Sequence, residues 1–392
     1  MSEVVNIPQL RFPEFNGEWE EKALGVVATI TTGSTPSTSN NEYYDGDVAF
    51  VSPADIQGNR IVRSTKTTIT ELGLSVVREI KKRSTLFVCI GSTIGKVSQA
   101  GVNCATNQQI NALTAKNSFD NDFIYSLLEF KAPRIKLLAG VQAVPQINKS
   151  EFSRFKFTFP LLPEQQKIAA FLTAVDNKIE QLSKKQELLG EYKKGAMQQI
   201  FSQAIRFKAD DGSTFPDWEE KKLGDVSDCL DNRRQPLNGA ERNQMKGDIP
   251  YYGANGIVDY VNDYIFDEEL VLLAEDGGNF NDFSSKPIAQ KISGKAWVNN
   301  HAHILKAKNI IATDFLFYSL VHKDIRRYIV GGSRAKLNKS DLLSIKTILP
   351  PLEEQAKIAS FLSSIDNKIE QVGKQLVESK QFKKALLQQM FV

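Results

Sequence analysis

The sequence predicts a mixed α/β protein in which two similar globular units are separated by two long helices that pack as an antiparallel coiled coil. A stretch of the chain occurs twice, at 160–202 and at 350–392, and the two copies align without a gap at an offset of 190 residues. Each copy carries an apolar seam with coiled-coil spacing. The segment before each copy consists of short β-rich runs bounded by Gly, Ser and Asn. These features indicate a pseudo-two-fold internal repeat.

Shared motifs divide the chain into four segments. We predict a first globular unit at 1–159, a first long helix at 160–202, a second globular unit at 203–349 and a second long helix at 350–392. The opening of the first unit, Trp19 to Gly25, recurs as Trp218 to Gly224. Between such anchors the units diverge, and residues 84–113 barely align with 267–308. This pattern suggests two copies of one fold that are adapted to two different ligands.

The repeated stretch has the features of a long helix. Its first seam consists of two rows, Ile168, Val175, Leu182, Leu189, Ala196 and Leu172, Ile179, Gln186, Lys193, Ile200, and the second copy repeats both. Pro163 and the pair Pro350-Pro351 suit helix entry. Gly190, Gly195 and Gly373 are expected to weaken or bend the helices locally. Two core helices in separate domains are the alternative, but two matched seams are explained more simply if they bury each other.

Within each unit the expected elements follow the same order. In unit one we expect strands at 48–51, 86–90 and 155–159 and a helix at 120–138. In unit two we expect strands at 269–273 and 344–349 and a helix at 313–329. The last expected strand of each unit, 155–159 or 344–349, therefore lies directly before the long helix.

Composition narrows the class of protein. The chain has 392 residues and a net charge of +3, a balance that neither requires nor excludes a nucleic-acid partner. Three cysteines without CxxC spacing fit a reducing cytoplasm and no disulfide framework. We expect no signal peptide in the first twelve residues and no membrane span, because long apolar runs are missing.

The spacing of the units suggests a periodic partner. A helix of roughly 39 residues is about 58 Å long. Antiparallel packing would place one globular unit at each end of this spacer. Duplex DNA is the obvious pseudo-symmetric partner, since two-fold proteins read half-sites separated by whole helical turns. Two differing units would read two differing half-sites with an unread gap between them.

Motifs for catalysis are weak. Gly91 to Val97 is one residue short of a phosphate loop, so we expect its turn and Lys96 to contact a DNA phosphate instead. Glu219-x-Lys221 lies too close to Asp217 for a metal nuclease and suits a solvated turn. His301 and His303 suggest two metal ligands, but neither a Cys nor a third His accompanies them in sequence. The pattern predicts a non-catalytic chain without a metal site.

Basic, amide and tyrosine residues gather where loops are expected. Lys and Arg suit phosphates, whereas Arg, Asn and Gln also read base edges. The candidate DNA contacts are Tyr43, Tyr44, Arg60, Lys66, Ser92, Thr93, Lys96, Gln142, Gln146, Asn148, Lys149, Arg233, Arg234, Tyr251, Tyr252, Asn255, Asn279, Arg334, Lys336, Asn338 and Lys339. Ordinary solvated surface is the alternative for each, and half-buried packing is the alternative for the tyrosine pairs.

The pattern resembles a known family, the specificity subunits of type I restriction–modification systems, over the full chain. The repeated PxxEQxKIAxFLxxxDNKIEQ motif carries most of the resemblance, with support from Gly247 to Gly253. The resemblance implies two target recognition domains, each reading half of a bipartite, asymmetric DNA site, and helices that set the spacer. It implies as partners two methyltransferase subunits for adenine-N6 methylation, and restriction subunits that add ATP-dependent cleavage. S-adenosylmethionine, ATP and Mg would bind those partners, and this chain would bind no cofactor.

The resemblance also gives a role to polar residues that repeat away from the seam. The predicted docking residues are Lys178, Glu180, Lys184 and Gln198 with Lys368, Glu370, Lys374 and Gln388. Recent duplication is the alternative explanation for their recurrence. Two other functions compete with the specificity subunit. A methyltransferase or nuclease acting alone lacks its motifs here, and a two-headed coiled-coil adaptor for protein partners would show no salt-sensitive DNA binding.

Overall fold

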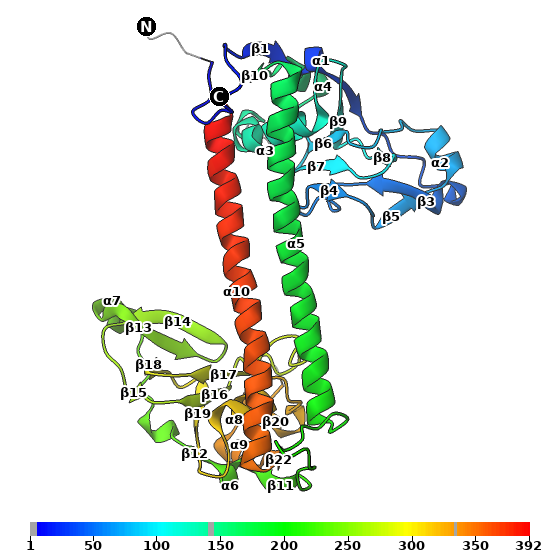
Figure 1. Ribbon diagram of the computed structural model, residues 1–392. Coiled ribbons are helices and arrows are strands. Elements are labelled where there is room, and N and C mark those ends of the chain that lie inside the picture. The colour runs from blue at the N-terminus through cyan, green and yellow to red at the C-terminus, as the bar shows by residue number, and fades with distance from the viewer. Residues whose placement is uncertain (1–5, 140–144, 333–334) are drawn as a thin grey trace. The chain divides into compact units, whose positions relative to one another are not determined.

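A computed structural model describes residues 6–139, 145–332 and 335–392 of the chain (Figure 1). It divides into two compact units. Unit 1 comprises residues 1–186 and 372–392, and unit 2 comprises residues 187–371. Each unit therefore holds one globular body and part of both long helices. Among the described residues, no helix is long and apolar enough to cross a membrane.

Among its described residues, the globular body of unit 1 begins with a short strand and contains fourteen further elements before the first long helix. They are β1 (Glu20–Ala23), α1 (Leu24–Val27), β2 (Ala28–Thr32), η1 (Asn41–Tyr43), β3 (Tyr44–Val51), β4 (Ile61–Val62), β5 (Thr67–Ile69), α2 (Glu71–Ser75), β6 (Thr85–Val88), β7 (Val97–Ala100), β8 (Cys104–Thr106), β9 (Ile110–Ala115), α3 (Asn121–Leu138), α4 (Lys149–Arg154) and β10 (Lys156–Phe159). The long helix α5 (Leu162–Phe201) follows and leads into unit 2.

Unit 2 repeats this order after α5. Its elements are β11 (Glu219–Lys222), α6 (Leu223–Val226), β12 (Ser227–Cys229), η2 (Asp231–Arg233), α7 (Gly239–Gln244), β13 (Lys246–Gly253), β14 (Gly256–Val261), β15 (Phe266–Asp267), β16 (Leu270–Ala274), β17 (Ala289–Ile292), β18 (Lys295–Val298), β19 (Ala302–Ala307), α8 (Thr313–Leu320), η3 (Arg326–Tyr328), β20 (Ile329–Val330), β21 (Lys336–Leu337), α9 (Lys339–Ser344) and β22 (Lys346–Leu349). The second long helix is α10 (Leu352–Met390).

The two globular bodies share a core sheet topology, to which each unit adds one strand, β4 in unit 1 and β15 in unit 2. In unit 1 a sheet of order β2-β9-β6-β7-β4 lies beside a second sheet, β5-β3-β8. Unit 2 has the orders β12-β19-β16-β17 and β14-β13-β18-β15. In both second sheets one strand pair is parallel, β3 with β8 and β13 with β18. A short antiparallel pair, β1–β10 or β11–β22, closes each unit beside its long helix.

Residues 84–113 and 267–308 occupy equivalent strands although their sequences barely align. Strand β6 pairs with β7 and β9, and β16 pairs in the same antiparallel manner with β17 and β19. Both central strands are buried along their whole length. Strands buried on both faces need only apolar bulk, so their sequences drift while their places in the sheet persist.

Most expected elements are present within one or two residues of their predicted bounds, but the second short helix is an exception. It was expected at 313–329, yet α8 ends at Leu320 and is followed by the short turn η3. The Asp324 carboxylate accepts hydrogen bonds from the Arg326 backbone N–H (3.1 Å) and from its guanidinium (2.9 Å). Aspartate that bonds to nearby backbone in this way competes with helix propagation. The prediction for 321–329 was therefore wrong.

The long helices pack against each other and against the globular bodies. In unit 1, Asp176 of α5 contacts Lys383 of α10 at 2.6 Å, and Gln186 lies beside Gly373, so the two segments run antiparallel. Unit 2 contains the equivalent ion pair, because Asp366 of α10 corresponds to Asp176 at the repeat offset of 190 and Lys193 of α5 corresponds to Lys383. These two residues are 2.5 Å apart. The described seam residues are buried or half-buried. Helical structure continues through the three seam-helix glycines. The predicted mixed α/β fold with packed long helices is confirmed.

A buried Glu-Gln pair at the start of each long helix holds the globular body. Glu164 is 2 % exposed and Glu354 is fully buried. In unit 1 the Glu164 carboxylate accepts two hydrogen bonds from Arg11, both at 2.8 Å, and one from the Trp19 indole. In unit 2 the Glu354 carboxylate accepts the same set from Arg206 (3.2 and 2.7 Å) and Trp218 (2.9 Å).

The neighbouring glutamines complete this attachment. Gln165 accepts from the backbone N–H of Asp120, and Gln355 accepts from that of Ala312, at the entrances to α3 and α8. Each glutamine also donates to the carbonyl of the proline five residues earlier, at 2.8 Å. Satisfying every polar group of a buried pair fixes the orientation of the elements that it joins. The repeated Glu-Gln motif thus has a structural role in both units.

Candidate nucleic-acid interface

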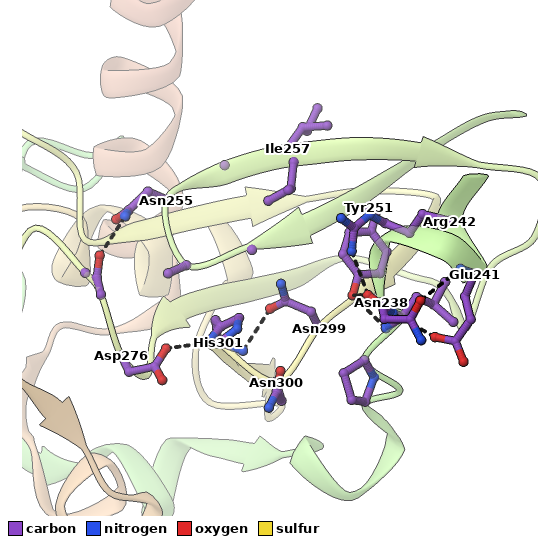
Figure 2. Close-up of a pocket in the computed structure, with 18 of the residues that line it drawn as sticks. Asn238, Glu241, Arg242, Tyr251, Asn255, Ile257, Asp276, Asn299, Asn300 and His301 are labelled. Carbon is purple, nitrogen blue, oxygen red and sulfur yellow. Dashed lines mark hydrogen bonds and ion pairs between the residues drawn. The ribbon is translucent and has the colours of Figure 1, made fainter. Parts of the chain in front are cut away.

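Unit 2 contains an open cavity of about 1210 Å³ at one edge of its sheets (Figure 2). The hairpin β13–β14, helix α7 and the turns at 276–278 and 299–301 line it. Figure 2 labels mostly amide and charged side chains on its walls, Asn238, Asn255, Asn299 and Asn300 among them. A concave site with several placed amide groups suits a polar ligand with a defined pattern of donors and acceptors.

The two turns of this cavity are held by short hydrogen bonds. His301 and Asp276 lie 2.5 Å apart from Nδ1 to Oδ1. The backbone N–H of His301 donates to Asn299 Oδ1 at 2.8 Å. Asn255 Nδ2 donates to the carbonyl of Gly277, whose φ of +61° lies in the left-handed region. These bonds fix the cavity wall before any ligand arrives.

The hairpin at the mouth of the cavity combines apolar and charged side chains. Ile257 and Val258 are 47 % and 59 % exposed on β14. Arg242 of α7 forms an ion pair with Asp259 at 3.1 Å and lies over the Tyr251 ring. Lys246 also contacts Asp259, and these hydrogen bonds lower the pKa of that carboxyl group to about 2. Methyl-bearing and basic groups at one rim match the mixture of methyl groups and phosphates on DNA.

A charged network lies behind the cavity. His303 is 1 % exposed, and its ring contacts Asp231 Oδ2 through Nδ1 (2.6 Å) and donates to the Leu337 carbonyl through Nε2 (2.8 Å). Arg234 and Lys336 surround the nearby Glu275 at 2.5 and 3.1 Å. Burial opposes the charge on His303, but its bonds to Asp231, Cys229 and Leu337 outweigh that cost and raise the pKa to about 9. The ring is therefore an imidazolium at neutral pH.

This network also bears on the predicted absence of a metal site. We expected no metal site because no cysteine accompanies the two histidines. The fold, however, brings Cys229 and Asp231 to His303, with one ligand atom of each within 4.8 Å of the others. That premise was wrong, because Cys229 is distant in sequence. Both ring nitrogens of His303 are engaged, Nδ1 with Asp231 and Nε2 with the Leu337 carbonyl, and the absence of a metal site stays a prediction.

Unit 1 has a glycine turn in the place of the 276–278 turn. Gly91 and Gly95 both have positive φ, and the Gly91 N–H donates to the Pro145 carbonyl. The Lys96 ammonium approaches the Pro53 carbonyl at 3.4 Å. The turn exists as expected, and its contact with a DNA phosphate stays a prediction.

The other predicted DNA contacts fall into three groups. Exposed residues are Lys66, Ser92, Gln146, Asn148, Lys149, Arg233, Asn255, Lys336 and Lys339. Half-buried residues are Tyr43, Tyr44, Thr93, Lys96, Tyr252, Asn279 and Asn338. Gln142 and Arg334 lie outside the described residues. Among the described unit 2 candidates, Tyr251 and Asn255 line the cavity, so the predicted set does not converge on one site.

Three of the predicted contacts are structural. The Arg60 side chain is 7 % exposed and forms ion pairs with Asp122 and Asp176, both at 2.9 Å. Arg234 is committed to Glu275 and to the Ala302 carbonyl. Tyr251 is 2 % exposed, and its hydroxyl accepts from the Leu237 backbone N–H. Residue type alone does not distinguish an arginine for DNA from one that neutralises buried acids, and these three assignments are corrected.

All eight predicted docking residues lie on exposed helix faces, consistent with but not testing their role. Glu180 pairs with Arg63 at 2.8 Å, with both side chains more than half exposed. Asp276 and Asn299, which line the cavity, were not predicted from the sequence, and His301 was considered only as a metal ligand. A usable signal was present, because an acid-glycine turn follows a fully apolar strand at 270–274, where loops with functional side chains emerge.

Known proteins match this chain over most of its length. Residues 16–189 and 216–379 match the family model for the type I restriction modification DNA specificity domain. The type I restriction enzyme MjaVIII specificity subunit of Methanocaldococcus jannaschii is 26 % identical over 412 residues, covering 96 % of this chain and 92 % of that one. The HindI specificity subunit of Haemophilus influenzae is 32 % identical over 149 residues, which are 36 % of this chain. This chain spans about a third of the length of the Haemophilus relatives that it matches.

A solved structure shares the fold. The crystal structure of the type I restriction–modification S subunit from M. genitalium superposes with a TM-score of 0.70 at 19 % identity. The match covers 98 % of this chain and 99 % of that one. At this identity the likeness concerns the fold.

Proposed function

We propose a role for this chain, which belongs to the family of type I restriction–modification DNA specificity subunits: each globular body reads one half of a bipartite, asymmetric DNA site. The duplicated helices set the unread spacer and dock two methyltransferase subunits. The chain directs adenine-N6 methylation and, with restriction subunits, ATP-dependent cleavage. It is itself non-catalytic and works in the cytoplasm.

One observation carries this proposal. Both units keep the same core strand order and the same buried Glu-Gln attachment to a long helix, while the connections between their strands differ in length. The two units thus share the elements that position the globular body on its helix, whereas the surfaces that they present to a ligand differ. This is the arrangement expected of two readers of different half-sites on one ruler, because phosphate contacts position a protein whereas base contacts specify.

Cofactors and catalysis are assigned to the partners in this proposal. S-adenosylmethionine would bind the methyltransferase subunits, and ATP and Mg would bind the restriction subunits. The residues of this chain supply surface, attachment and recognition. The cavity of unit 2, with its amide groups fixed in place, is the recognition surface that we assign to the second half-site.

A methylome tests the proposal. The chain is expressed with its cognate methyltransferase subunit in a host that lacks adenine methylation, and modified adenines are mapped by single-molecule sequencing. We expect one bipartite motif with an unread gap. Exchange of residues 1–159 for those of a relative should alter one half of the motif only. A stable complex that adds no methylation, or a motif without a gap, would contradict the proposal.

A further inference from the structure

A three-residue turn occurs at the same place in both units. It is Asn107–Gln109 before β9 and Asn299–His301 before β19, at an offset of 192 residues. The backbone N–H of Asn107 donates to the Val51 carbonyl at 3.1 Å, and that of Asn299 donates to the Tyr252 carbonyl at 3.0 Å. Each bond ties the turn to the C-terminal end of an internal strand of the second sheet, β3 or β13. The two turns are therefore the same structural element.

The first residue of each turn stabilises it from within. Asn107 Oδ1 accepts from the Gln109 backbone N–H at 3.1 Å. Asn299 Oδ1 accepts in the same way from His301 at 2.8 Å. An asparagine that bonds two residues ahead imposes a tight turn without needing a neighbouring strand. The backbone that follows is thereby fixed.

The third residue is also occupied. Gln109 Nε2 donates to the Ile90 carbonyl at 3.4 Å, and His301 Nδ1 meets Asp276 Oδ1 at 2.5 Å. Both partners belong to the turn that follows the central strand, β6 or β16. In addition, the carbonyl of the third residue accepts from the backbone N–H of Cys89 or Glu275. The turn is braced on both sides.

The middle residue of each turn is open to solvent, and in unit 2 the neighbouring His301 is exposed as well. Gln108 and Asn300 are both exposed. The Thr35 hydroxyl donates to Gln108 Oε1 at 2.8 Å, which restrains the amide through its oxygen. Asn300 lies at the wall of the cavity beside His301 (Figure 2). The two units diverge in sequence elsewhere, but both place an amide side chain on a rigid turn directly before β9 or β19.

We propose that Gln108 and Asn300 are base-reading residues, one for each half of the DNA site, an assignment that rests on the proposed function. An amide carries a donor and an acceptor side by side, which matches the N7 acceptor and N6 donor of adenine in the major groove. Gln108 is longer by one methylene, so the two turns read at different depths. A rigid backbone with an exposed tip is what accurate base contact requires.

The test uses the complete methyltransferase complex and the variants Gln108→Ala and Asn300→Ala. Asn117→Ala and Asn309→Ala are matched controls, because these exposed amides follow the far ends of β9 and β19 at the same 192-residue offset. We expect Asn300→Ala to relax one base position in one half-site, by about tenfold or more in relative methylation, and Gln108→Ala to relax one position in the other half. Both controls should keep the original motif.

A second variant separates base reading from stability. Asn300→Asp keeps the shape of the side chain and removes its donor, so the same position should relax again. An unchanged motif in the alanine and aspartate variants would overturn the proposal. An equal fall of methylation at every site would also overturn it, because that result indicates phosphate contact or scaffolding. If the unaltered chain directs no bipartite methylation, the proposed function fails instead.

Discussion

The same internal position of the main sheet is neutral in unit 1 and charged in unit 2. In unit 1 the Thr32 hydroxyl donates to Asn111 Oδ1 at 2.7 Å, and Asn111 Nδ2 donates to Cys89 Sγ at 3.1 Å. Burial raises the pKa of the Cys89 thiol to about 12, so this thiol stays neutral. In unit 2 the corresponding positions hold Asp231, His303 and Glu275.

The difference concerns how the segment after α3 or α8 is attached to the main sheet. Both units attach the segment after α3 or α8 by a backbone bond, from Ile147 to Cys89 in unit 1 and from Leu337 to Glu275 in unit 2. Among the described residues at these two positions, a charged side chain strengthens this attachment in unit 2 alone, where His303 Nε2 donates to the Leu337 carbonyl. One fold therefore holds a neutral group at this position in unit 1 and a titratable ion pair in unit 2, whereas the attachment to the long helices is common to both.

The largest effect should come from the common attachment. Glu354→Ala removes the acceptor for Arg206 and Trp218 from a fully buried position, and we expect unit 2 to lose about 3 kcal/mol of stability. Glu164→Ala should cost unit 1 a similar amount. Urea unfolding followed by hydrogen exchange and mass spectrometry resolves the units. Glu353→Ala is the control, since this exposed neighbour should change stability by less than about 0.5 kcal/mol. Equal losses in Glu353 and Glu354 variants would contradict the attachment.

The second effect separates the units by pH. The pKa of His303 rises from an ordinary value near 6.5 to about 9 on folding, so its stabilisation is fully present below about pH 6.5. It is lost as the pH rises through 9, and its upper limit is on the order of 3 kcal/mol. The protection of the Leu337 amide from hydrogen exchange, taken relative to its intrinsic rate at each pH, should fall over this range, while the protection of Ile147 in unit 1 should show no matching change.

His303→Asn supplies the matched control for this comparison. Asparagine is the residue that unit 1 carries at the equivalent position, Asn111, so the variant should remove the pH dependence of unit 2 between pH 6 and 9. Lower stability at pH 6 is expected as well, because Asp231 loses one of its two cationic partners and keeps only Arg234, at 3.4 Å. A pH profile that survives this substitution would assign the titration to another group.

Prediction from sequence succeeded where the repeat supplied a comparison within the chain. The Glu164-Gln165 and Glu354-Gln355 pairs recur without a gap, so the helices and their junctions were identified. It failed where the two units share a structural element whose sequence does not recur. Asn107–Gln109 and Asn299–His301 form one turn, but the connection from β6 to β7 and that from β16 to β17 differ in length, which hid the correspondence. Arg60 and Arg234 were misassigned because their acidic partners come from distant parts of the chain.

The third effect compares the cross-helix ion pairs. Lys383 is 11 % exposed and contacts both Asp176 and Glu129 in unit 1, whereas Lys193 is 18 % exposed and its partner Asp366 is 37 % exposed. Lys383→Met should therefore cost about 2 kcal/mol or more, since it leaves buried acids with fewer partners. Lys193→Met should cost about 1 kcal/mol or less. Similar losses at both sites, measured by urea unfolding, would show that burial does not separate them.

The smallest effect on folding should have the largest consequence for assembly. Lys178 and Lys368 occupy the same repeat position, and both are exposed on the long helices. Charge reversal, Lys178→Glu with Lys368→Glu, should change unfolding by no more than about 0.5 kcal/mol at each site. Under the proposed docking role, the same variant should lose co-purification with the methyltransferase subunit, because like charges at an interface oppose association. Lys185→Glu, an exposed lysine of the same helix whose equivalent in the second copy is Gln375, is the control and should assemble normally. Retained assembly by the double variant would remove these lysines from the interface while leaving the shared fold of the two units untouched.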